Sequence, residues 1–195
     1  MAKANAPLFS LKASGKLGDA LVYFNWKGIN CVRSYVIPSN PRSTAQLAQR
    51  DHMINAVLNW HLTSHSALDR QAWANWATAI VATLTGFNAF CKHYIKVAIL
   101  GKSWANFHDY ENTAKTTTTI TSDLASNANV TDVRCWYGLS PTSMINQVAC
   151  TGTYEAWEAA IEGLAINTKY YLQFEAVAPD NLATGKSGIY TETTS

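Results

Sequence analysis

The C-terminal half of the fold is decided by the stretch GLAINTKYYLQFEAVA, residues 163–178. Every second residue from Tyr170 to Ala176 is apolar or aromatic, so these side chains can face one way along a strand. Further short runs rich in β-branched and aromatic residues are separated by Gly, Pro, Asn and Asp. They are residues 116–121, 131–137, 147–151, 154–161 and 187–194. Strands at this density predict a β-sandwich.

The same stretch resembles the segment of fibronectin type III domains that runs Gly-Leu-x-Pro-x-Thr-x-Tyr, although Ile166 stands where that family usually has Pro. Residues 133–142 are similar to the strand and turn that these domains place upstream, and residues 187–191 to their last strand. The resemblance covers residues 116–195 and implies a tyrosine corner, in which the Tyr170 hydroxyl bonds back to the backbone. An exposed Trp136 would suit an interface anchor, but we first assign it to the core. The expected sandwich core is Trp136, Leu164, Tyr170, Leu172 and Phe174.

The N-terminal region begins with a predicted β-hairpin. Residues 20–26 and 29–36 are strand-like and flank Lys27-Gly28, a pair that suits a tight turn. Pro38 and Pro41 follow, and because proline fixes φ and restricts its predecessor, they indicate an extended connector.

Helices are predicted after this connector. Ser43–Gln46 and Ser66–Asp69 match the capping box that begins a helix, and a third run at helical spacing extends from Phe87 to Ala98. We therefore predict an α+β fold, with an N-terminal β-hairpin and two or three α-helices followed by a fibronectin type III-like (immunoglobulin-like) β-sandwich. The expected domains are a basic hairpin-and-helix assembly domain at 1–110 and the sandwich at 116–195. We expect residues 112–115 to be a linker.

The composition favours a protein that is covered by partners. Hydrophobic residues make up 48% of the 195 residues and charged residues 14%, with seven Trp and nine Tyr. This excludes intrinsic disorder, and so low a charge favours self-assembly. Residues 1–100 hold ten Lys or Arg and three Asp or Glu, whereas residues 101–195 hold five and ten. A chain with two oppositely charged ends favours head-to-tail contact, or an acidic partner at one end.

Basic and aromatic side chains are interleaved near the N-terminus. Such a pattern can track a nucleic-acid backbone, but no RNA- or DNA-binding motif accompanies it, so protein contact is the preferred interpretation and nucleic acid the alternative. The predicted assembly interface is Lys16, Tyr23, Trp26, Lys27, Arg33, Tyr35 and Arg42.

The sequence offers little chemistry. Its four cysteines form no CxxC pair and are predicted to be free buried thiols, and no nucleotide, hydrolase or metalloprotease motif occurs. His61 and His65 are four apart, but the cap at Ser66 places a helix break beside them, which disfavours a metal pair. We expect no enzyme, no catalytic residue, no metal and no cofactor. No run of signal-peptide or membrane-spanning length is found, so we expect neither Sec export nor membrane insertion.

The opening of the chain carries a second resemblance. Residues 13–18, 32–35 and 38–43 with Gln46 look like the start of small uncharacterised proteins encoded by phages, prophages and bacterial genomes. Together with a fibronectin-like sandwich at the C-terminus, this opening implies a virion structural protein, either a capsid decoration or a tail accessory protein, made in the host cytoplasm without a signal peptide. Its expected partners are copies of itself and other virion proteins. The alternatives are a module that binds a host glycan or receptor, and a subunit of a homopolymeric extracellular filament.

Overall fold

The computed structural model describes residues 2–3, 14–37, 39–40, 42–62, 64–80, 83–127, 130–153, 155–177 and 185–195. The chain forms two compact units, Met1–Ser43 and Thr44–Ser195, called here the N-terminal unit and the C-terminal unit. Helices and antiparallel sheets occur together, which confirms a mixed α+β fold. The boundary between the units differs from the predicted domain boundary at 110–116, because the helices belong to the same unit as the two large sheets.

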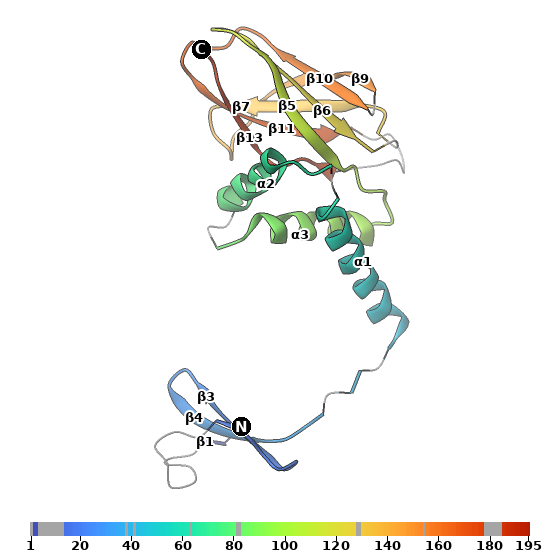
Figure 1. Ribbon diagram of the computed structural model, residues 1–195, viewed down its shortest axis with the longest axis vertical. Coiled ribbons are helices and arrows are strands. Elements are labelled where there is room, and N and C mark those ends of the chain that lie inside the picture. The colour runs from blue at the N-terminus through green and yellow to red at the C-terminus, as the bar shows by residue number, and fades with distance from the viewer. Residues whose placement is uncertain are drawn as a thin grey trace. The chain divides into compact units, whose positions relative to one another are not determined.

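The N-terminal unit is a small antiparallel sheet. Its strands are β1 (Ala2–Lys3), β2 (Gly15–Leu17), β3 (Leu21–Trp26) and β4 (Ile29–Ser34), in the order β1-β4-β3-β2 (Figure 1). The predicted hairpin is confirmed. Its turn has φ 50° at Lys27 and 80° at Gly28, the left-handed pair that matches the twist of a hairpin. The side chain of Asn25 accepts a hydrogen bond from the Gly28 N–H at 2.9 Å. Pro38 and Pro41 of the predicted connector lie outside the described residues.

Three helices open the C-terminal unit: α1 (Thr44–Trp60), α2 (Ala67–Ile80) and α3 (Gly86–Ile99). The capping box of α2 is confirmed, since the Asp69 N–H donates to Ser66 Oγ at 3.1 Å and the Ser66 N–H donates to Asp69 Oδ2 at 2.8 Å. Thr85 caps α3 by accepting a hydrogen bond from the Asn88 N–H at 3.3 Å. Local sequence therefore sets where these two helices begin.

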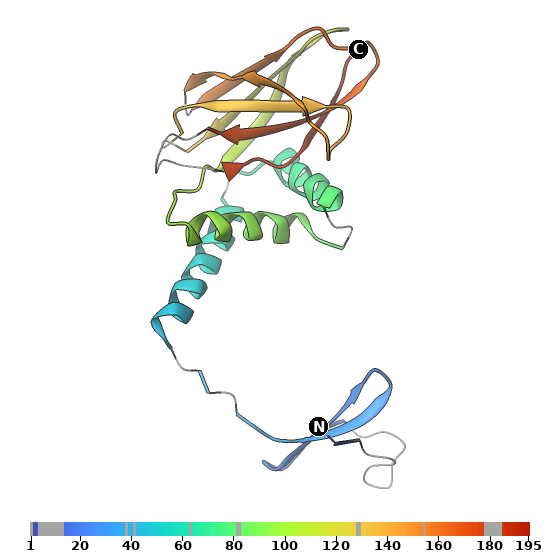
Figure 2. The same cartoon turned by 180° about the vertical axis from the view of Figure 1, so that it is seen from behind.

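Two antiparallel sheets follow the helices. The first has the order β5-β6-β10-β9, with β5 (Phe107–Lys115), β6 (Ile120–Ser126), β10 (Ala156–Ile161) and β9 (Thr151–Thr153). The second has the order β12-β11-β7-β8, with β12 (Gly185–Lys186), β11 (Lys169–Ala176), β7 (Val133–Gly138) and β8 (Asn146–Ala149), and β13 (Tyr190–Thr193) also pairs with β11. In both views α2 and α3 lie on one side of these sheets (Figure 1, Figure 2).

The predicted linker at 112–115 is wrong, because these residues are the end of β5. The pairing of β5 with β6 shifts register between His108 and Glu111 and again between Asn112 and Ala114. Each such irregularity resets the two-residue alternation by which a strand is recognised in a sequence. The strand is therefore specified by its partner β6 and not by its own pattern.

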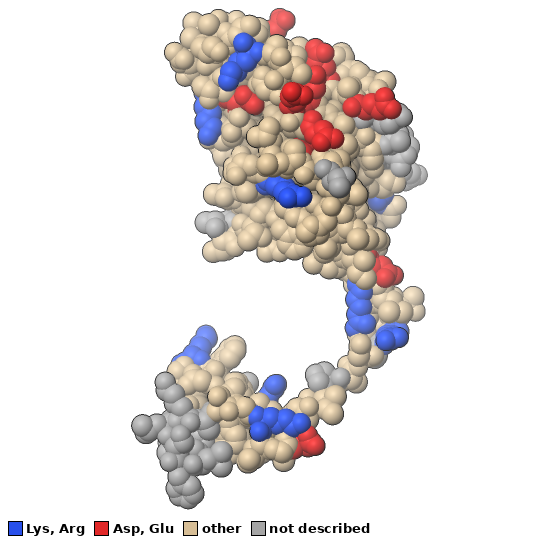
Figure 3. Space-filling view, viewed as in Figure 1, with Lys and Arg blue, Asp and Glu red and all other residues tan. Residues whose placement is uncertain are grey.

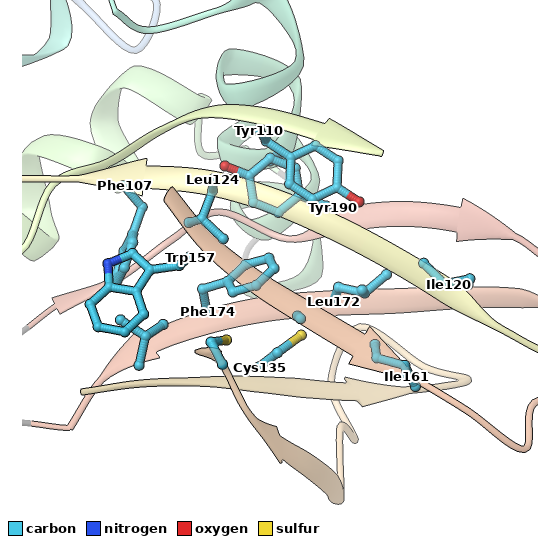
Figure 4. Close-up of a cluster of buried hydrophobic side chains, with 14 of the residues drawn as sticks. Phe107, Tyr110, Ile120, Leu124, Cys135, Trp157, Ile161, Leu172, Phe174 and Tyr190 are labelled. Carbon is cyan, nitrogen blue, oxygen red and sulfur yellow. The ribbon is translucent and has the colours of Figure 1, made fainter. Parts of the chain in front are cut away.

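The inward faces of the two sheets share one core (Figure 4). Leu164, Tyr170, Leu172 and Phe174 are buried there as predicted. The Tyr170 hydroxyl accepts a hydrogen bond from the Ala165 N–H at 2.9 Å, which is the expected bond back to the backbone. Tyr110 of β5 and Tyr190 of β13 stack with ring centroids 3.9 Å apart, so aromatic side chains close the space between the two sheets.

The assignment of Trp136 to this core is wrong. Val133 and Cys135 of β7 are fully buried, and because successive side chains of a strand alternate, Trp136 faces the opposite side of the sheet. Its indole is partly buried and donates a hydrogen bond to Glu175 Oε2 at 2.7 Å. Val133 and Cys135 therefore occupy the core side of β7, although Trp136 is the largest side chain of the strand.

Asp69 joins the helices to both sheets. This fully buried carboxylate accepts the hydroxyl of Tyr190 at 2.7 Å and the Asp109 N–H at 2.9 Å, in addition to its capping bond. A second core lies between the helices and the five-stranded sheet, made by Trp73, Trp76, Phe90, Trp104 and Ile189 among others. All four cysteines are free and buried, as predicted.

Candidate assembly site

The N-terminal sheet gathers basic and aromatic side chains on one face. Lys16 pairs with Val22, and Val22 pairs with Arg33, so these three side chains share a side of the sheet. Alternation along β3 and β4 adds the other members. We call this surface the basic-aromatic face, and it consists of Lys16, Val22, Phe24, Trp26, Ile29, Cys31, Arg33 and Tyr35.

Cations and rings are in contact across this face. The ammonium of Lys16 lies 4.1 Å from the centroid of the Tyr35 ring, and the guanidinium carbon of Arg33 lies 5.7 Å from that of Phe24. Lys16 also forms an ion pair with the exposed Asp19. The Trp26 side chain is 57% exposed and Ile29 is 42% exposed, so the face presents large apolar surface beside its charges. Aromatic residues and Arg are enriched in protein interfaces, where they often dominate the binding energy.

The structure brings together four of the seven predicted interface residues. Tyr23 falls on the opposite face of the sheet, where it pairs with Val32. Lys27 occupies the turn and Arg42 lies exposed beyond the last strand, so neither belongs to the face. The predicted interface omits Val22, Phe24, Ile29 and Cys31, although alternation on each side of the Lys27-Gly28 turn could have identified them.

Helix α1 carries a second exposed apolar surface. Met53, Ile54 and Leu58 are 42%, 55% and 61% exposed, and with Val57 and Arg50 they line a shallow hollow of about 440 Å³. Among the described residues of this helix only Ala56 is buried. A helix of 17 residues with so little buried surface gains little stability from its own packing.

The outer face of the four-stranded sheet is acidic. Glu111 of β5 and Glu158 of β10 both pair with Asp123 of β6, so three carboxylates lie in one row across three strands. Red side chains gather in Figure 3 where Figure 1 places these strands. Within the described part of the chain none of the three forms an ion pair. Burial, reinforced by Glu158 and Glu111, raises the pKa of Asp123. We call this surface the acidic row.

Reactive chemistry is not concentrated anywhere in the described ranges. They contain no group of three or more His, Cys, Asp and Glu arranged to hold a metal ion, and no helix there is long and apolar enough to cross a membrane. Burial raises the pKa of the Cys91 thiol, and raises that of Cys150 to about 12. These thiols are therefore protonated at neutral pH and are poor nucleophiles.

Comparison with protein-family models and with curated proteins finds no match for this chain. We therefore infer the function of the chain from the charged and apolar surfaces of its two units.

Proposed function

We propose that this chain is a non-enzymatic structural subunit of a bacteriophage particle that works through contacts between copies and with the shell or tail. The observation that carries the proposal is how few apolar side chains the N-terminal unit buries. Among its described residues Cys31 is the only buried apolar side chain, while Leu17, Trp26, Ile29, Val36 and Ile37 are all more than 40% exposed.

Such a sheet is marginal by itself. A small sheet without a covered apolar face has little to offset the conformational entropy lost on folding. Covering apolar surface contributes about 25 cal/mol per Å², so a partner that removes several hundred Å² adds several kcal/mol. The exposed side chains of this unit are therefore best explained as one half of an interface.

Charge favours a second copy of the same chain as the partner. Residues 1–43 hold six Lys or Arg against one Asp, whereas residues 44–195 hold nine against twelve Asp or Glu. The acidic row consists of like charges placed directly opposite one another, an arrangement that destabilises a sheet until a cation approaches. Lys16 and Arg33 of a neighbouring copy are suitable cations. The basic-aromatic face of one copy then covers the acidic row of the next, a head-to-tail contact that can repeat.

The virion setting rests on the two resemblances. Two antiparallel sheets with a common core, together with the bond from the Ala165 N–H to the Tyr170 hydroxyl, support a fibronectin type III-like sandwich at the C-terminus. The phage-like opening of the chain supports a place on a capsid or tail, and assembly in the host cytoplasm. Repetition of a modest contact is enough for such a subunit, because avidity multiplies the affinity of each contact.

The test is light scattering of the purified protein over a range of concentration and salt. We expect oligomers that grow with concentration and weaken with salt, since exposed charges are screened beyond about 10 Å at 0.1 M salt. Reversing Lys16 and Arg33, the two cations of the basic-aromatic face, to Glu should weaken association about tenfold or more. Reversing Lys92 and Lys96, exposed cations of the C-terminal unit, is the matched control and should have little effect. A monomer at all salt concentrations would contradict the proposal.

A further inference from the structure

A groove lies on the C-terminal unit, between α2 and the loop of residues 139–145 that joins β7 to β8. It consists of two adjoining hollows, of about 470 Å³ and about 380 Å³, which share Ala79 on the helix and Pro141 on the loop. Both volumes fall within the range of small-molecule sites, about 300–1,000 Å³. Its floor is the outer face of the five-stranded sheet, the face to which Trp136 is turned.

The walls of this groove are fixed. The Ile189 N–H donates to the carbonyl of Ala72 at 2.9 Å, which holds α2 against the chain that enters β13. The loop folds back on β7 so closely that a Cβ at Gly138 would lie 2.6 Å from the carbonyl oxygen of Ser143. A groove with rigid walls needs little reorganisation when a ligand binds.

The first hollow contains a positioned indole. Glu175 accepts the Trp136 N–H through one oxygen and pairs with the Lys186 ammonium at 3.1 Å through the other. Gln173, which pairs with Trp136 across the strands, donates its amide N–H to Ser187 at 3.0 Å, and its amide oxygen has no hydrogen-bond partner among the described residues. A ring held in one orientation beside an available acceptor can bind a ligand without losing rotamer entropy.

The second hollow repeats this combination. Tyr171 lies two residues before Gln173 on β11, and the Lys169 ammonium is 5.2 Å from the centroid of its ring. Asn75 is fixed by a hydrogen bond from its amide to the Ile189 carbonyl at 3.0 Å, and Thr78 and Thr191 add hydroxyl groups. Each hollow thus offers one aromatic ring, neutral hydrogen-bonding groups and one lysine, and Lys169 lies over the Tyr171 ring.

This lining disfavours other ligand classes. A purely apolar ligand would leave these amides and hydroxyls without partners, which costs free energy for each group. A nucleotide needs several cations around its phosphates, but each hollow has a single lysine, and Lys186 is already paired with Glu175. A peptide that adds to a sheet needs a free strand edge, whereas β11 is paired with β7 on one side and with β12 and β13 on the other.

We propose that this groove binds a neutral oligosaccharide, with consecutive rings over Trp136 and Tyr171. Pyranose rings expose C–H groups that pack on an aromatic face and hydroxyls that both donate and accept hydrogen bonds. Those are the two kinds of contact that the groove supplies in each hollow. The proposal is independent of the assembly proposal, because every lining residue lies in the C-terminal unit.

The test is calorimetric or NMR titration of the whole 195-residue chain with cellotetraose, maltotetraose and tetra-N-acetylchitotetraose. We expect at least one of them to bind with a dissociation constant at or below about 1 mM. Trp136→Ala should weaken that binding about tenfold, because both stacking and buried area are lost. Trp26→Ala removes an exposed indole from the other unit and should leave the affinity unchanged.

A second variant protects the test against misfolding of Trp136→Ala. Ala79→Phe fills the junction of the two hollows from the helix surface and should block binding without removing a core side chain. The charge-reversed assembly variant should keep its saccharide affinity. The proposal is overturned if none of the three sugars binds at about 10 mM, ten times the weakest constant expected, or if both groove variants bind as tightly as the original chain.

Discussion

The two units of this chain bury their side chains to very different extents. The C-terminal unit encloses two cores, one between its sheets and one between its helices and the five-stranded sheet. The N-terminal unit, over its described residues, encloses Cys31 and exposes Trp26, Ile29 and Val36. One unit is stabilised by contacts within the chain, whereas the other has its apolar side chains where a partner can reach them.

This difference assigns separate roles to the two units. A stable body can carry a rigid site such as the groove beside Trp136, because its walls are held by the same contacts that stabilise the fold. A weakly enclosed sheet is suited to a contact that becomes fully ordered only when another molecule covers it. Changes that act on one unit and spare the other therefore test the division directly.

The largest loss of stability is expected on substitution of Asp69. Asp69→Asn leaves the shape intact but replaces one acceptor oxygen by an NH₂ group, which then faces N–H or O–H donors. Hydrogen bonds to a buried charged group contribute about 1.5–3 kcal/mol each, so the free energy of unfolding of the C-terminal unit should fall by about 3 kcal/mol. Urea unfolding followed by tryptophan fluorescence measures the loss.

Asp51→Asn is the matched control, because Asp51 is exposed on α1 and the same chemical change there should be nearly neutral. Amide exchange in β3 and β4 should be the same in both variants. If Asp69→Asn loosened the N-terminal sheet as strongly as the C-terminal unit, the two units would be one cooperative body and the comparison would fail.

The extent to which sequence predicted this fold depends on how local the determining contacts are. The beginning of α2 follows from Ser66 and Asp69, three residues apart, and the hairpin follows from Lys27-Gly28 between two strand-like runs. Strand β5 was missed because its two irregularities remove the alternation, and its pairing with β6 depends on the folded sheet. Trp136 was misplaced because a strand alternates in either of two senses, and size alone does not choose between them.

The candidate sites show the same limit. Four members of the basic-aromatic face could be predicted, since they lie on neighbouring strands of one short hairpin sheet. The acidic row joins Glu111, Asp123 and Glu158 from three strands, and it exists only once their register is set. The groove joins a helix, a strand face and a loop that are far apart in the sequence, so no local pattern indicates it.

The second largest effect is expected from acid, which should lower the free energy of unfolding of the C-terminal unit. Burial, reinforced by Lys96, Lys92 and Lys186, lowers the pKa of His93 from 6.5 to about 4, and burial also lowers the pKa of His65. Because the unfolded chain takes up these protons first, stability is complete above about pH 6.5 and falls as the pH drops below that value. Because the His93 ring is partly exposed and its charge is screened by solvent, His93 alone should cost about 1 kcal/mol at pH 5.

Thermal unfolding at pH 7 and pH 5 measures this loss. The His93→Gln side chain cannot be protonated, so this variant should show a smaller difference in stability between the two pH values. The N-terminal unit contains no histidine, so exchange of its amides should change only by the intrinsic effect of pH. Equal pH dependence in the original chain and in His93→Gln would contradict the assignment.

The smallest effect concerns the turn of the N-terminal hairpin. Lys27 has a φ of 50°, a left-handed conformation that costs a lysine about 1 kcal/mol and that asparagine adopts more readily. Lys27→Asn creates the Asn-Gly pair preferred in such turns and should stabilise the sheet by about 0.5–1 kcal/mol. Amide protection in β3 and β4 should rise about two- to fivefold without any change in the C-terminal unit. Lys27→Gln removes the same charge and keeps the unfavourable backbone, so equal protection in the two variants would show that charge and not turn geometry limits this sheet. If amide protection rises only in Lys27→Asn, turn geometry limits the stability of the N-terminal sheet, and this variant has a sheet that is more ordered in the absence of a partner.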